Sequence, residues 1–129
     1  MNLNNKRILI TGGAGFIGLN LINKLLKETN SLIFNLDKLN YASNLDFLLN
    51  TLGNNPRHFF FKNDLVNSVD LENVFKKSNP DIIFHLAAES HVDRSIINPE
   101  IFIRSNILGT FNLLQASKRH WENLELDRK

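Results

Sequence analysis

The sequence predicts an α/β protein with a doubly wound parallel sheet. Short apolar segments rich in β-branched residues alternate with segments whose apolar residues recur at helical spacing. A glycine-rich turn joins the first strand-like segment to the first helix-like one, and no internal repeat breaks the alternation. Such alternation implies right-handed crossovers and helices on both faces of a parallel sheet. We therefore expect four β–α units with the spatial strand order 3-2-1-4.

The first half of the chain contains two predicted strands and a helix. Residues 7–11 ("RILIT") form an apolar run that stops at a pair of glycines, which is typical of a buried strand. Apolar residues three and four positions apart predict a helix over residues 16–27. A second strand is expected over residues 31–36 ("SLIFNL"). The longer connection over residues 37–55 can hold a short helix near residues 45–52.

A third strand and a capped helix follow. The strand is expected over residues 58–61 ("HFFF"), because aromatic residues favour extended backbone. Ser68 is the predicted N-cap of a helix over residues 69–77, since its hydroxyl oxygen can accept a hydrogen bond from the first turn. Asp70 and Glu72 place negative charge near the N-terminus of that helix, which is favourable.

The last predicted unit ends in a long helix. The fourth strand is expected over residues 81–86. Asn98 as a cap and Pro99 at the first helical position predict a helix from residue 99 to about residue 120. Four strands would leave the outer edge of the fourth strand unpaired. We therefore expect residues 1–129 to be the N-terminal portion of a larger α/β domain, with the remaining strands and a substrate domain outside this chain.

Composition excludes several classes of protein. Hydrophobic residues make up 43% of the 129 residues, which is enough for a compact core. Lysine and arginine are spread along the chain and the net charge is only +2, so no nucleic-acid partner is expected. The absence of cysteine excludes disulfides and thiolate metal sites and suits a reducing compartment. No run approaches the roughly 20 apolar residues of a membrane span, and no signal peptide is visible, so we expect a cytoplasmic protein without a membrane partner.

The segment "TGGAGFIG" (residues 11–18) has the form of a phosphate-binding turn. One of the paired glycines, Gly12 or Gly13, permits the sharp change of direction after the strand. Gly15 lets a pyrophosphate approach the backbone at the helix N-terminus, and Gly18 lets the helix pack closely on the strand. Together with the strand before it and the helix after it, the turn predicts a Rossmann-like dinucleotide-binding unit. A P-loop ATPase does not fit, because no Gly-Lys-Ser/Thr follows the glycines.

Two acidic residues follow predicted strands where a dinucleotide would need them. Asp37 stands nineteen residues after Gly18, where a carboxylate accepts hydrogen bonds from the adenosine ribose. It would repel a 2′-phosphate and so favours NAD over NADP, although Lys38 weakens that preference slightly. Asp64 follows the third strand, where its carboxylate can accept from the adenine amine while the Leu65 N–H donates to the ring. The alternative for Asp64 is an ordinary loop or capping residue.

The segment "HLAAESHVDRSI" (residues 85–96) follows the fourth strand and is dense in ionisable groups. Leu86, Ala87 and Ala88 leave the strand at the switch point of the sheet, where ligands bind in open α/β folds. Their mostly small side chains let a flat cofactor lie against the backbone. The simplest interpretation of His85 is a hydrogen-bonded residue at the end of a core strand.

Two catalytic interpretations of this loop conflict with its spacing. A metal site would lack the HExxH helix pattern and any cysteine. Its candidate ligands are His85, Glu89, His91 and Asp93. A serine hydrolase triad of Ser90, His91 and Asp93 is too compact in sequence, and no G-x-S-x-G elbow is present. We interpret His91, Asp93 and Arg94 as polar residues that order the loop.

Four segments resemble one family: "TGGAGFIG", "NLDKLNYASNLDFL", "HLAAESHVDRSI" and "NILGTFNLLQASKRHW". They are similar to the N-terminal part of the dTDP-glucose 4,6-dehydratases, which are extended short-chain dehydrogenases/reductases. The resemblance covers nearly the whole chain and implies an NAD-dependent lyase. In that reaction NAD takes a hydride from C4 of the sugar of dTDP-glucose, water leaves across C5 and C6, and the hydride returns to C6. The product is a 4-keto-6-deoxy sugar nucleotide, a precursor of dTDP-rhamnose.

The resemblance also implies which residues hold NAD. They come from the phosphate turn, the end of the second strand, the residue pair after the third strand, the loop after the fourth strand and the last helix. The implied set is Gly12, Gly15, Phe16, Ile17, Gly18, Asp37, Lys38, Leu39, Asn40, Asp64, Leu65, Leu86, Ala87, Ala88, Glu89, Ser90 and Ser105. Ser90 would also face the sugar nucleotide. Family members are homodimers that pair helices, and the helix over residues 99–120 would supply part of that interface.

The chain departs from the family pattern in small and large ways. Asn40 stands where the family commonly has Thr, Ser43 where it has Gly, and Ser105 where it has Thr. No catalytic residue is expected here, because the family's Tyr-x-x-x-Lys and Thr-Asp-Glu groups lie further along. The only tyrosine is Tyr41, with Leu45 four positions later, so we expect the 129 residues alone to be inactive. The alternatives are another NDP-sugar dehydratase or epimerase, or a non-catalytic dinucleotide-binding or interaction module.

Overall fold

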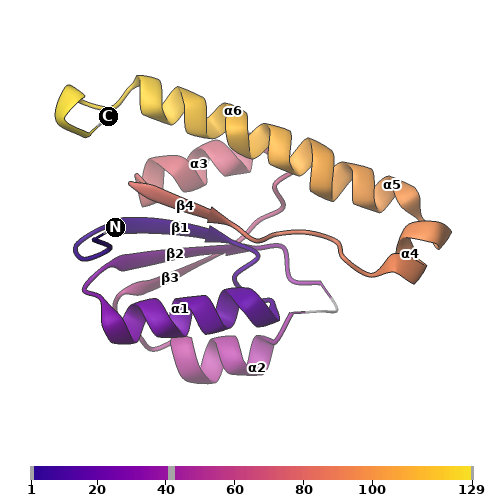
Figure 1. Ribbon diagram of the computed structural model, residues 1–129, viewed down its shortest axis with the longest axis horizontal. Helices are drawn as coiled ribbons and strands as arrows, with labels where there is room; N and C mark the ends of the chain where they lie inside the picture. Colours follow the sequence, from indigo (N-terminus) through magenta and orange to yellow (C-terminus); the bar gives the residue numbers. More distant parts are fainter. Residues whose placement is uncertain (1, 41–42, 129) are drawn as a thin grey trace.

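One parallel sheet organises the molecule, whose computed structural model describes residues 2–40 and 43–128. The strands are β1 (Arg7–Thr11), β2 (Leu32–Asp37), β3 (His58–Lys62) and β4 (Ile82–His85). Their order is β3-β2-β1-β4, which confirms the predicted 3-2-1-4 arrangement (Figure 1). Thr11 pairs with Leu36 of β2 and with His85 of β4, so segments far apart in sequence end at the same edge of the sheet. Within the described residues, β4 pairs only with β1.

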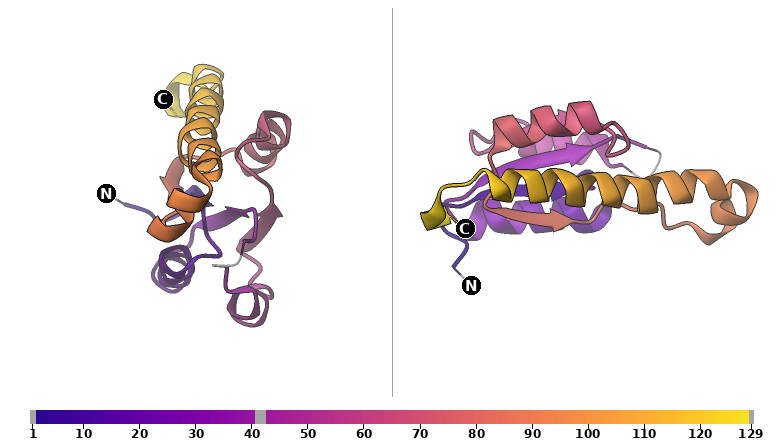
Figure 2. Two further views of the ribbon diagram at one scale, coloured as in Figure 1. Left: turned by 90° about the vertical axis from the view of Figure 1, so that its right-hand side faces the viewer. Right: turned by 90° about the horizontal axis from the view of Figure 1, so that it is seen from above.

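Helices cover both faces of the sheet (Figure 1, Figure 2). On one face lie α1 (Phe16–Glu28) and the consecutive segments α2 (Leu45–Phe47) and η1 (Leu48–Leu52). On the other lie α3 (Ser68–Ser78) and α6 (Gly109–Glu122). The remaining elements are α4 (Val92–Ile97), α5 (Pro99–Phe102), η2 (Ile103–Leu108) and η3 (Leu126–Arg128). None of the helices in the described ranges is both long enough and apolar enough to cross a membrane.

Strand β1 is the centre of the core because helices cover both of its faces. Ile8 and Ile10 pack with the apolar side chains of α1 and η1, whereas Leu9 packs with those of α3 and α6. All three side chains are 0% exposed. Successive residues of a strand point to opposite faces, so a strand covered on both sides needs an unbroken apolar run. This explains why "RILIT" lacks the apolar–polar alternation of a half-exposed strand.

Two helix starts differ in detail from the prediction. Ser68 is the first residue of α3 and not its cap. The cap is Asn67, whose side-chain oxygen accepts from the Asp70 N–H at 3.2 Å and whose amide donates to the Asp70 carboxylate at 2.6 Å. Both Asn and Ser are good caps, so the position of the side-chain oxygen over the first turn decides between them. Asn98 occupies the predicted cap position of α5, but its side chain makes no capping hydrogen bond.

The segment after β4 contains a helix that the sequence did not predict. α4 begins within residues 85–96, which the sequence predicts to be a polar loop, and ends one residue beyond them. Val92, Ile96 and Ile97 are 71%, 75% and 83% exposed, so this helix has no buried face and shows no core periodicity. The predicted long helix is present from Pro99 to Glu122, as α5, η2 and α6 in succession. Its middle part, η2, is π-helical.

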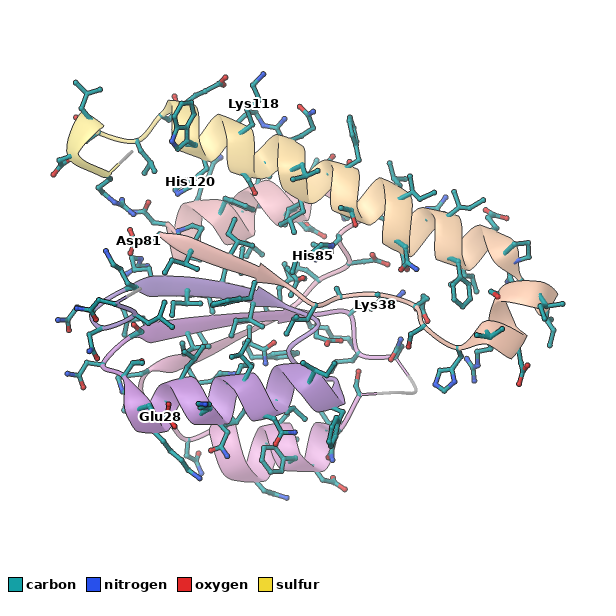
Figure 3. The ribbon with its side chains drawn as sticks, viewed as in Figure 1. Glu28, Lys38, Asp81, His85, Lys118 and His120 are labelled. Atoms are coloured by element: carbon teal, nitrogen blue, oxygen red, sulfur yellow. The ribbon has the colours of Figure 1, made fainter. Side chains whose placement is uncertain are left out.

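The two ends of the sheet differ in their chemistry (Figure 3). Asp81 lies at the end where the strands begin, and its carboxylate accepts from the Arg7 N–H at 2.8 Å. Burial raises the pKa of Asp81, but the hydrogen bonds from Arg7 and Arg128 outweigh it and lower the pKa overall. His85 and Lys38 lie toward the opposite end, where the strands finish (Figure 3). The candidate cofactor-binding residues predicted from the sequence lie at this second end of the sheet.

His85 links β1, β4 and α6. Its Nδ1 lies 2.6 Å from Thr11 Oγ1, and its Nε2 lies 2.9 Å from Thr110 Oγ1. The Thr110 hydroxyl donates to the Asn106 carbonyl at 2.7 Å, so it accepts from a protonated Nε2. Nδ1 then accepts from Thr11, which makes the neutral ring the best fit. Burial lowers the pKa of His85 accordingly, and its interpretation as a hydrogen-bonded residue at the end of a core strand is confirmed.

His58 is a second neutral histidine in the core. Its Nδ1 lies 3.2 Å from the Leu52 carbonyl, which can only accept, and its Nε2 lies 3.3 Å from Asn35 Nδ2, which can only donate. A proton on Nε2 would therefore face another donor. Burial lowers the pKa of His58 more than the hydrogen bond to Leu52 raises it.

We expect the free energy of unfolding to fall as pH drops from about 7.5 to about 5.5. His58 and His85 have folded-state pKa values below that of an unfolded histidine, which is about 6.5. Their contribution is complete above the unfolded value and is lost as pH falls through the folded values. Denaturant unfolding followed by circular dichroism measures the slope, which should be shallower in His58→Gln and in His85→Gln. A transition that is independent of pH over this range contradicts the prediction.

Candidate functional site

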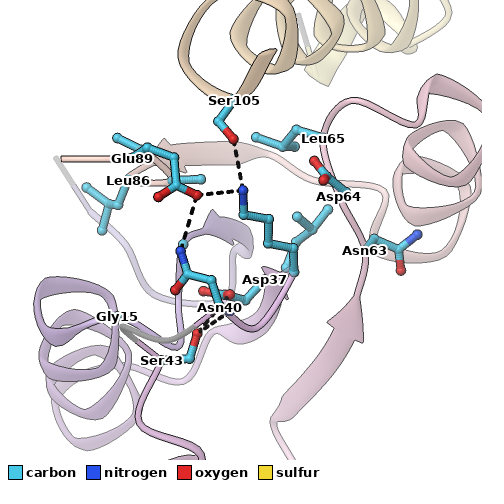
Figure 4. A pocket seen from close by; sticks show the side chains of 15 residues that line it. Gly15, Asp37, Asn40, Ser43, Asn63, Asp64, Leu65, Leu86, Glu89 and Ser105 are labelled. Carbon is cyan, nitrogen blue, oxygen red and sulfur yellow. Dashed lines mark hydrogen bonds and ion pairs between the residues drawn. The ribbon is translucent and has the colours of Figure 1, made fainter. Parts of the chain in front are cut away.

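A cavity opens where the strands of the sheet end (Figure 4). Its walls come from the turn after β1, the end of β2, the loop after β3, the loop after β4 and the η2 segment. The lining residues are Gly12, Gly15, Leu36, Asp37, Lys38, Asn40, Ser43, Asn63, Asp64, Leu65, Leu86, Ala87, Ala88, Glu89 and Ser105. This is the edge of a parallel sheet at which ligands bind in open α/β folds.

Most of the predicted cofactor residues line this cavity. The exceptions are Phe16, Ile17, Gly18, Leu39 and Ser90. Phe16 and Ile17 are 84% and 67% exposed at the start of α1, next to Gly15, which does line the cavity. Leu36, Ser43 and Asn63 line the cavity without having been predicted as binding residues. The sequence does contain an indication for Asn63, because a polar residue directly after a parallel strand lies at the ligand-binding edge of the sheet.

The glycine turn brings backbone segments too close together for side chains. Gly12 has a φ of +73°, and a Cβ on it would lie 2.6 Å from the Ala87 amide nitrogen. The turn after β1 therefore touches the loop after β4 directly. A Cβ on Gly18 would overlap the Gly12 carbonyl oxygen and lie 2.6 Å from Gly13 Cα. Gly18 thus lets α1 pack closely against the turn that directly follows β1.

The N-terminus of α1 is open to an anion. Gly15 is its N-cap, no side chain caps the helix, and the first turn contains no acidic residue. The first N–H groups of any helix lack partners within the helix, and the helix dipole is positive there. A Cβ on Gly15 would have its nearest neighbour, the Gly12 carbonyl oxygen, at 3.4 Å, so this glycine leaves room at the cavity wall. Backbone amides and open space together suit a phosphate group.

Asp37 joins the glycine turn to the end of β2. One carboxylate oxygen accepts from the Ala14 N–H at 2.9 Å, and the other accepts from the Leu39 N–H at 2.8 Å and from the Ser43 hydroxyl at 3.4 Å. Leu39 adopts a left-handed φ of 59°, which a side chain rarely takes and which its hydrogen bond to Asp37 supports. Each carboxylate oxygen has more than one lone pair, so Asp37 can still accept from a ligand hydroxyl.

An ion pair crosses the cavity between the end of β2 and the loop after β4 (Figure 4). Lys38 Nζ lies 2.7 Å from Glu89 Oε1 and donates to Ser105 Oγ at 2.9 Å. Asn40 Nδ2 donates to the same Glu89 oxygen at 3.3 Å. Burial raises the pKa of Glu89, but the hydrogen bond and charge of Lys38, followed by Asn40 and Arg94, outweigh it and lower the pKa. Glu89 is therefore ionised at neutral pH.

The η2 segment holds the loop after β4 in place. The side chain of Asn106 accepts from the Glu89 N–H at 2.8 Å and donates to the Glu89 carbonyl at 2.9 Å. Neighbouring Ser105 receives the hydrogen bond of Lys38. Two consecutive residues of η2 thus support both partners of the ion pair. π-helical turns within longer helices are frequent at functional sites.

Asp64 and Leu65 form the wall beyond β3. One Asp64 carboxylate oxygen accepts from the Val66 N–H at 3.1 Å, so Asp64 also stabilises its own turn. The Asn112 amide of α6 donates to the Leu65 and Val66 carbonyls at 3.0 and 3.1 Å. Asp64 therefore has the turn role named as its alternative, and it lines the cavity as well.

The polar residues beyond Glu89 do not form a catalytic cluster. Ser90 is exposed in the loop, His91 is the exposed N-cap of α4, and Asp93 lies in the first turn of that helix. His85 is bonded to Thr11 and Thr110 away from them. Among the residues that the structure describes, no group of three or more His, Asp and Glu side chains is placed to hold a metal ion.

The fold and the cavity together define the Rossmann-like class of nucleotide-binding α/β domains. A family model described as GDP-mannose 4,6 dehydratase matches residues 9–127. The chain belongs to this family.

Within this family, the chain is similar to curated dTDP-glucose 4,6-dehydratases. A dTDP-glucose 4,6-dehydratase from Neisseria gonorrhoeae is 44% identical over 124 residues, which cover 96% of this chain and 36% of the relative. One from Escherichia coli is 47% identical over 123 residues, which cover 95% of this chain and 34% of the relative. These relatives confirm the resemblance found in the sequence. The chain spans about a third of the length of the curated relatives it matches.

Solved structures confirm the fold. A dTDP-glucose 4,6-dehydratase from Streptomyces venezuelae, solved with NAD bound, has a TM-score of 0.80 and 36% identity, covering 88% of this chain and 36% of that one. A UDP-glucose 4-epimerase from Thermotoga maritima, solved with UDP-glucose, has a TM-score of 0.76 and 30% identity, covering 88% of this chain and 34% of that one.

We expect Gly18→Ala to lower the free energy of unfolding by about 1–3 kcal/mol, the usual cost of forcing a methyl group into packed backbone. Gly15→Ala is the matched control in the same turn, because its new Cβ would meet only an ordinary contact at 3.4 Å. The control should lose less than about 1 kcal/mol, the difference between Gly and Ala at a cap. Urea unfolding of both variants tests this. Equal stability of the two variants contradicts the proposed packing.

Proposed function

We propose that this chain is the NAD-binding part of a dTDP-glucose 4,6-dehydratase, with residues 1–129 as the N-terminal portion of its Rossmann-like domain. The observation that carries the proposal is the cavity, which gathers residues from five separate segments of the chain. Most of them are the residues that the resemblance implies for NAD. Membership of the dehydratase family and 44–47% identity to curated dTDP-glucose 4,6-dehydratases support the same conclusion.

The glycine turn and Asp37 would hold the phosphates and the adenosine ribose. Backbone N–H groups at Phe16 and Ile17 stand at the open N-terminus of α1, and they would donate to the pyrophosphate. The Gly15 N–H instead donates to the Gly12 carbonyl at 3.2 Å and so closes the turn. Gly12 and Gly18 keep the turn compact enough for that approach. Asp37, whose carboxylate keeps unused lone pairs, would accept hydrogen bonds from the ribose hydroxyls.

The loops after β3 and β4 would hold the two rings. Asp64 would accept from the adenine amine and the Leu65 N–H would donate to the ring. Leu86, Ala87 and Ala88 would form the wall on the nicotinamide side, since backbone is accessible beside their mostly small side chains. NAD, when bound, supplies a hydride acceptor whose reduced form can return the hydride.

The remaining implied residues would close the site around the cofactor. Lys38, Leu39 and Asn40 would flank the adenosine ribose, and Glu89 and Ser105 would complete the wall opposite them. Ser90 is exposed in the loop beyond the cavity, and it would face the sugar nucleotide.

The complete protein would convert dTDP-glucose to dTDP-4-keto-6-deoxyglucose, a step toward dTDP-rhamnose and related sugars. The segment "HLAAESHVDRSI" and the dTDP-glucose relatives favour this substrate. The absence of cysteine supports the cytoplasm as the compartment in which it works.

We also propose that the complete protein pairs with a second copy through the run of α5, η2 and α6. Apolar side chains on this run are exposed in the isolated chain: Ile103 at 56%, Ile107 at 65%, Phe111 at 54% and Leu114 at 62%. Spacings of three and four residues place them on one helical face. An exposed apolar face of this kind is typical of an interaction surface.

A second candidate is another NDP-sugar dehydratase or epimerase. The TM-score of 0.76 with a UDP-glucose 4-epimerase supports this candidate, because the two enzyme types share this part of the fold. A non-catalytic dinucleotide-binding or interaction module is the candidate from a different class. The cofactor cavity is common to all three, so binding of NAD alone does not separate them.

We expect Asp37→Ala to weaken NAD binding by about 1–3 kcal/mol, the usual cost of losing a charge-assisted hydrogen bond. Asp46→Ala is the matched control, because Asp46 is exposed on α2 and does not line the cavity. Isothermal titration calorimetry measures both affinities, with melting curves to show that each variant is folded. An unchanged affinity in Asp37→Ala removes Asp37 from the proposed site.

We expect no 4-keto sugar product when the 129-residue chain is mixed with NAD and dTDP-glucose. Hydride removal at C4 needs a base beside the C4 hydroxyl. By resemblance that base belongs to a Tyr-x-x-x-Lys pair, whereas the only tyrosine here is Tyr41, outside the described residues and followed by Leu45 four positions later. The absorbance of the 4-keto product in alkali measures turnover, with a full-length dTDP-glucose 4,6-dehydratase as the positive control. Product formed by the chain alone contradicts the prediction.

A further inference from the structure

We infer that Glu89 is a specificity-determining residue: its ion pair with Lys38 makes the site prefer a cofactor with a free 2′-hydroxyl over one with a 2′-phosphate. The inference rests on the proposed function, because it concerns the adenosine end of the same cavity. It adds a reason for the preference beyond the charge of Asp37.

Lys38 occupies a position from which a cation could pair with a 2′-phosphate. It directly follows Asp37, the carboxylate at the end of β2 that faces the adenosine ribose in this type of fold. Basic residues near that position are what accommodate the 2′-phosphate in NADP-binding members of the fold. Taken alone, an Asp–Lys pair at the end of β2 would therefore leave the choice between the two cofactors open.

In the structure the Lys38 ammonium already has partners within the chain. Its Nζ is bound by Glu89 Oε1 at 2.7 Å and by Ser105 Oγ at 2.9 Å, on the opposite wall of the cavity. The side chain of Glu89 is only 7% exposed, whereas that of Lys38 is 31% exposed. If Lys38 moved to a 2′-phosphate, Glu89 would keep a largely buried charge without its main partner, which is unfavourable.

Glu89 is itself held in position from two sides. Asn106 binds both its backbone N–H and its carbonyl, and Asn40 donates to the same oxygen that receives Lys38. Arg94 of α4 lowers the pKa of Glu89 by its charge, although more weakly than Lys38 does. The acceptor for Lys38 is therefore preorganised, and the ion pair does not depend on two freely rotating side chains.

The charges of the residues that line the cavity also disfavour a 2′-phosphate. Its ionisable lining residues are the three carboxylates of Asp37, Asp64 and Glu89 and the single ammonium of Lys38. With Lys38 neutralised by Glu89, the other ionisable residues that line the cavity and would meet a dianionic 2′-phosphate are Asp37 and Asp64, which are both carboxylates. Removing the Glu89 charge would release Lys38, and removing the Lys38 charge would leave Glu89 facing the ligand.

The test measures, by calorimetry, the dissociation constant of NADP divided by that of NAD. This ratio is compared in wild type, the two single variants and the double variant. Wild type should prefer NAD. Glu89→Gln should lower the ratio by roughly two- to fivefold, the range that partly exposed ion-pair energies correspond to. Lys38→Gln should raise the ratio, because Glu89 is then uncompensated. The double variant should return close to the wild-type ratio, since both charges are gone.

The matched control is Glu72→Gln, which breaks the ion pair of Glu72 with Arg119 between α3 and α6, outside the cavity. It should leave the ratio unchanged. The inference is overturned if Glu89→Gln leaves the ratio unchanged, or if both single variants shift it in the same direction, as general damage to the site would. Wild type that binds neither cofactor refutes the proposed function itself, and with it this inference. Should Glu89→Gln fail to fold, an unchanged ratio in Lys38→Gln still overturns the inference.

Discussion

The parallel pairing of β1 with β2 and β4 is the constraint on which the site depends. Thr11, the last residue of β1, pairs with Leu36 on one side and with His85 on the other. The three strands therefore finish together, and the segments that follow them converge on one edge of the sheet. Without this pairing the glycine turn, Asp37 and the loop after β4 would be unrelated parts of the chain.

Hydrogen bonds within the chain make that edge a defined surface. The Asp37 carboxylate receives backbone N–H groups from Ala14 and Leu39, so the glycine turn and the end of β2 keep one relative position. His85 joins Thr11 to Thr110 and so ties the end of β4 to α6. Asp37 and His85, which join these walls, therefore have hydrogen-bond partners within the chain before any ligand arrives. This kind of preorganisation lowers the cost of binding.

The sequence predicted those features that depend on local pattern. Strand order followed from the alternation of strand and helix periods, and the need for a glycine at position 12 or 13 followed from the turn at the strand end. The structure shows that Gly12 is the one with a positive φ. It missed α4, because a helix without a buried face leaves no periodic signal. It named Ser68 and not Asn67 as the cap of α3, since neighbouring residues with equal capping tendency differ only in where their oxygens point. The sequence predicted close packing at Gly18, and the nearest neighbours of a Cβ placed there belong to Gly12 and Gly13, in the turn directly after β1.

Sequence alone was sufficient for the fold class, for the edge of the sheet at which a ligand would bind and for most of the residues that line the cavity. The fold class and the edge follow from hydrophobic periodicity and turn chemistry, which act over a few residues, whereas many of the lining residues were implied by the resemblance to a family. Only the tertiary structure decided that Lys38 meets Glu89 and Ser105, and that Asn106 holds the Glu89 backbone. Such contacts join residues far apart along the chain. The geometry of these contacts depends on how the helices pack on the sheet and on the π-helical backbone of η2, which sets the direction of Ser105 and Asn106. No pattern within a few residues of sequence predicts either feature.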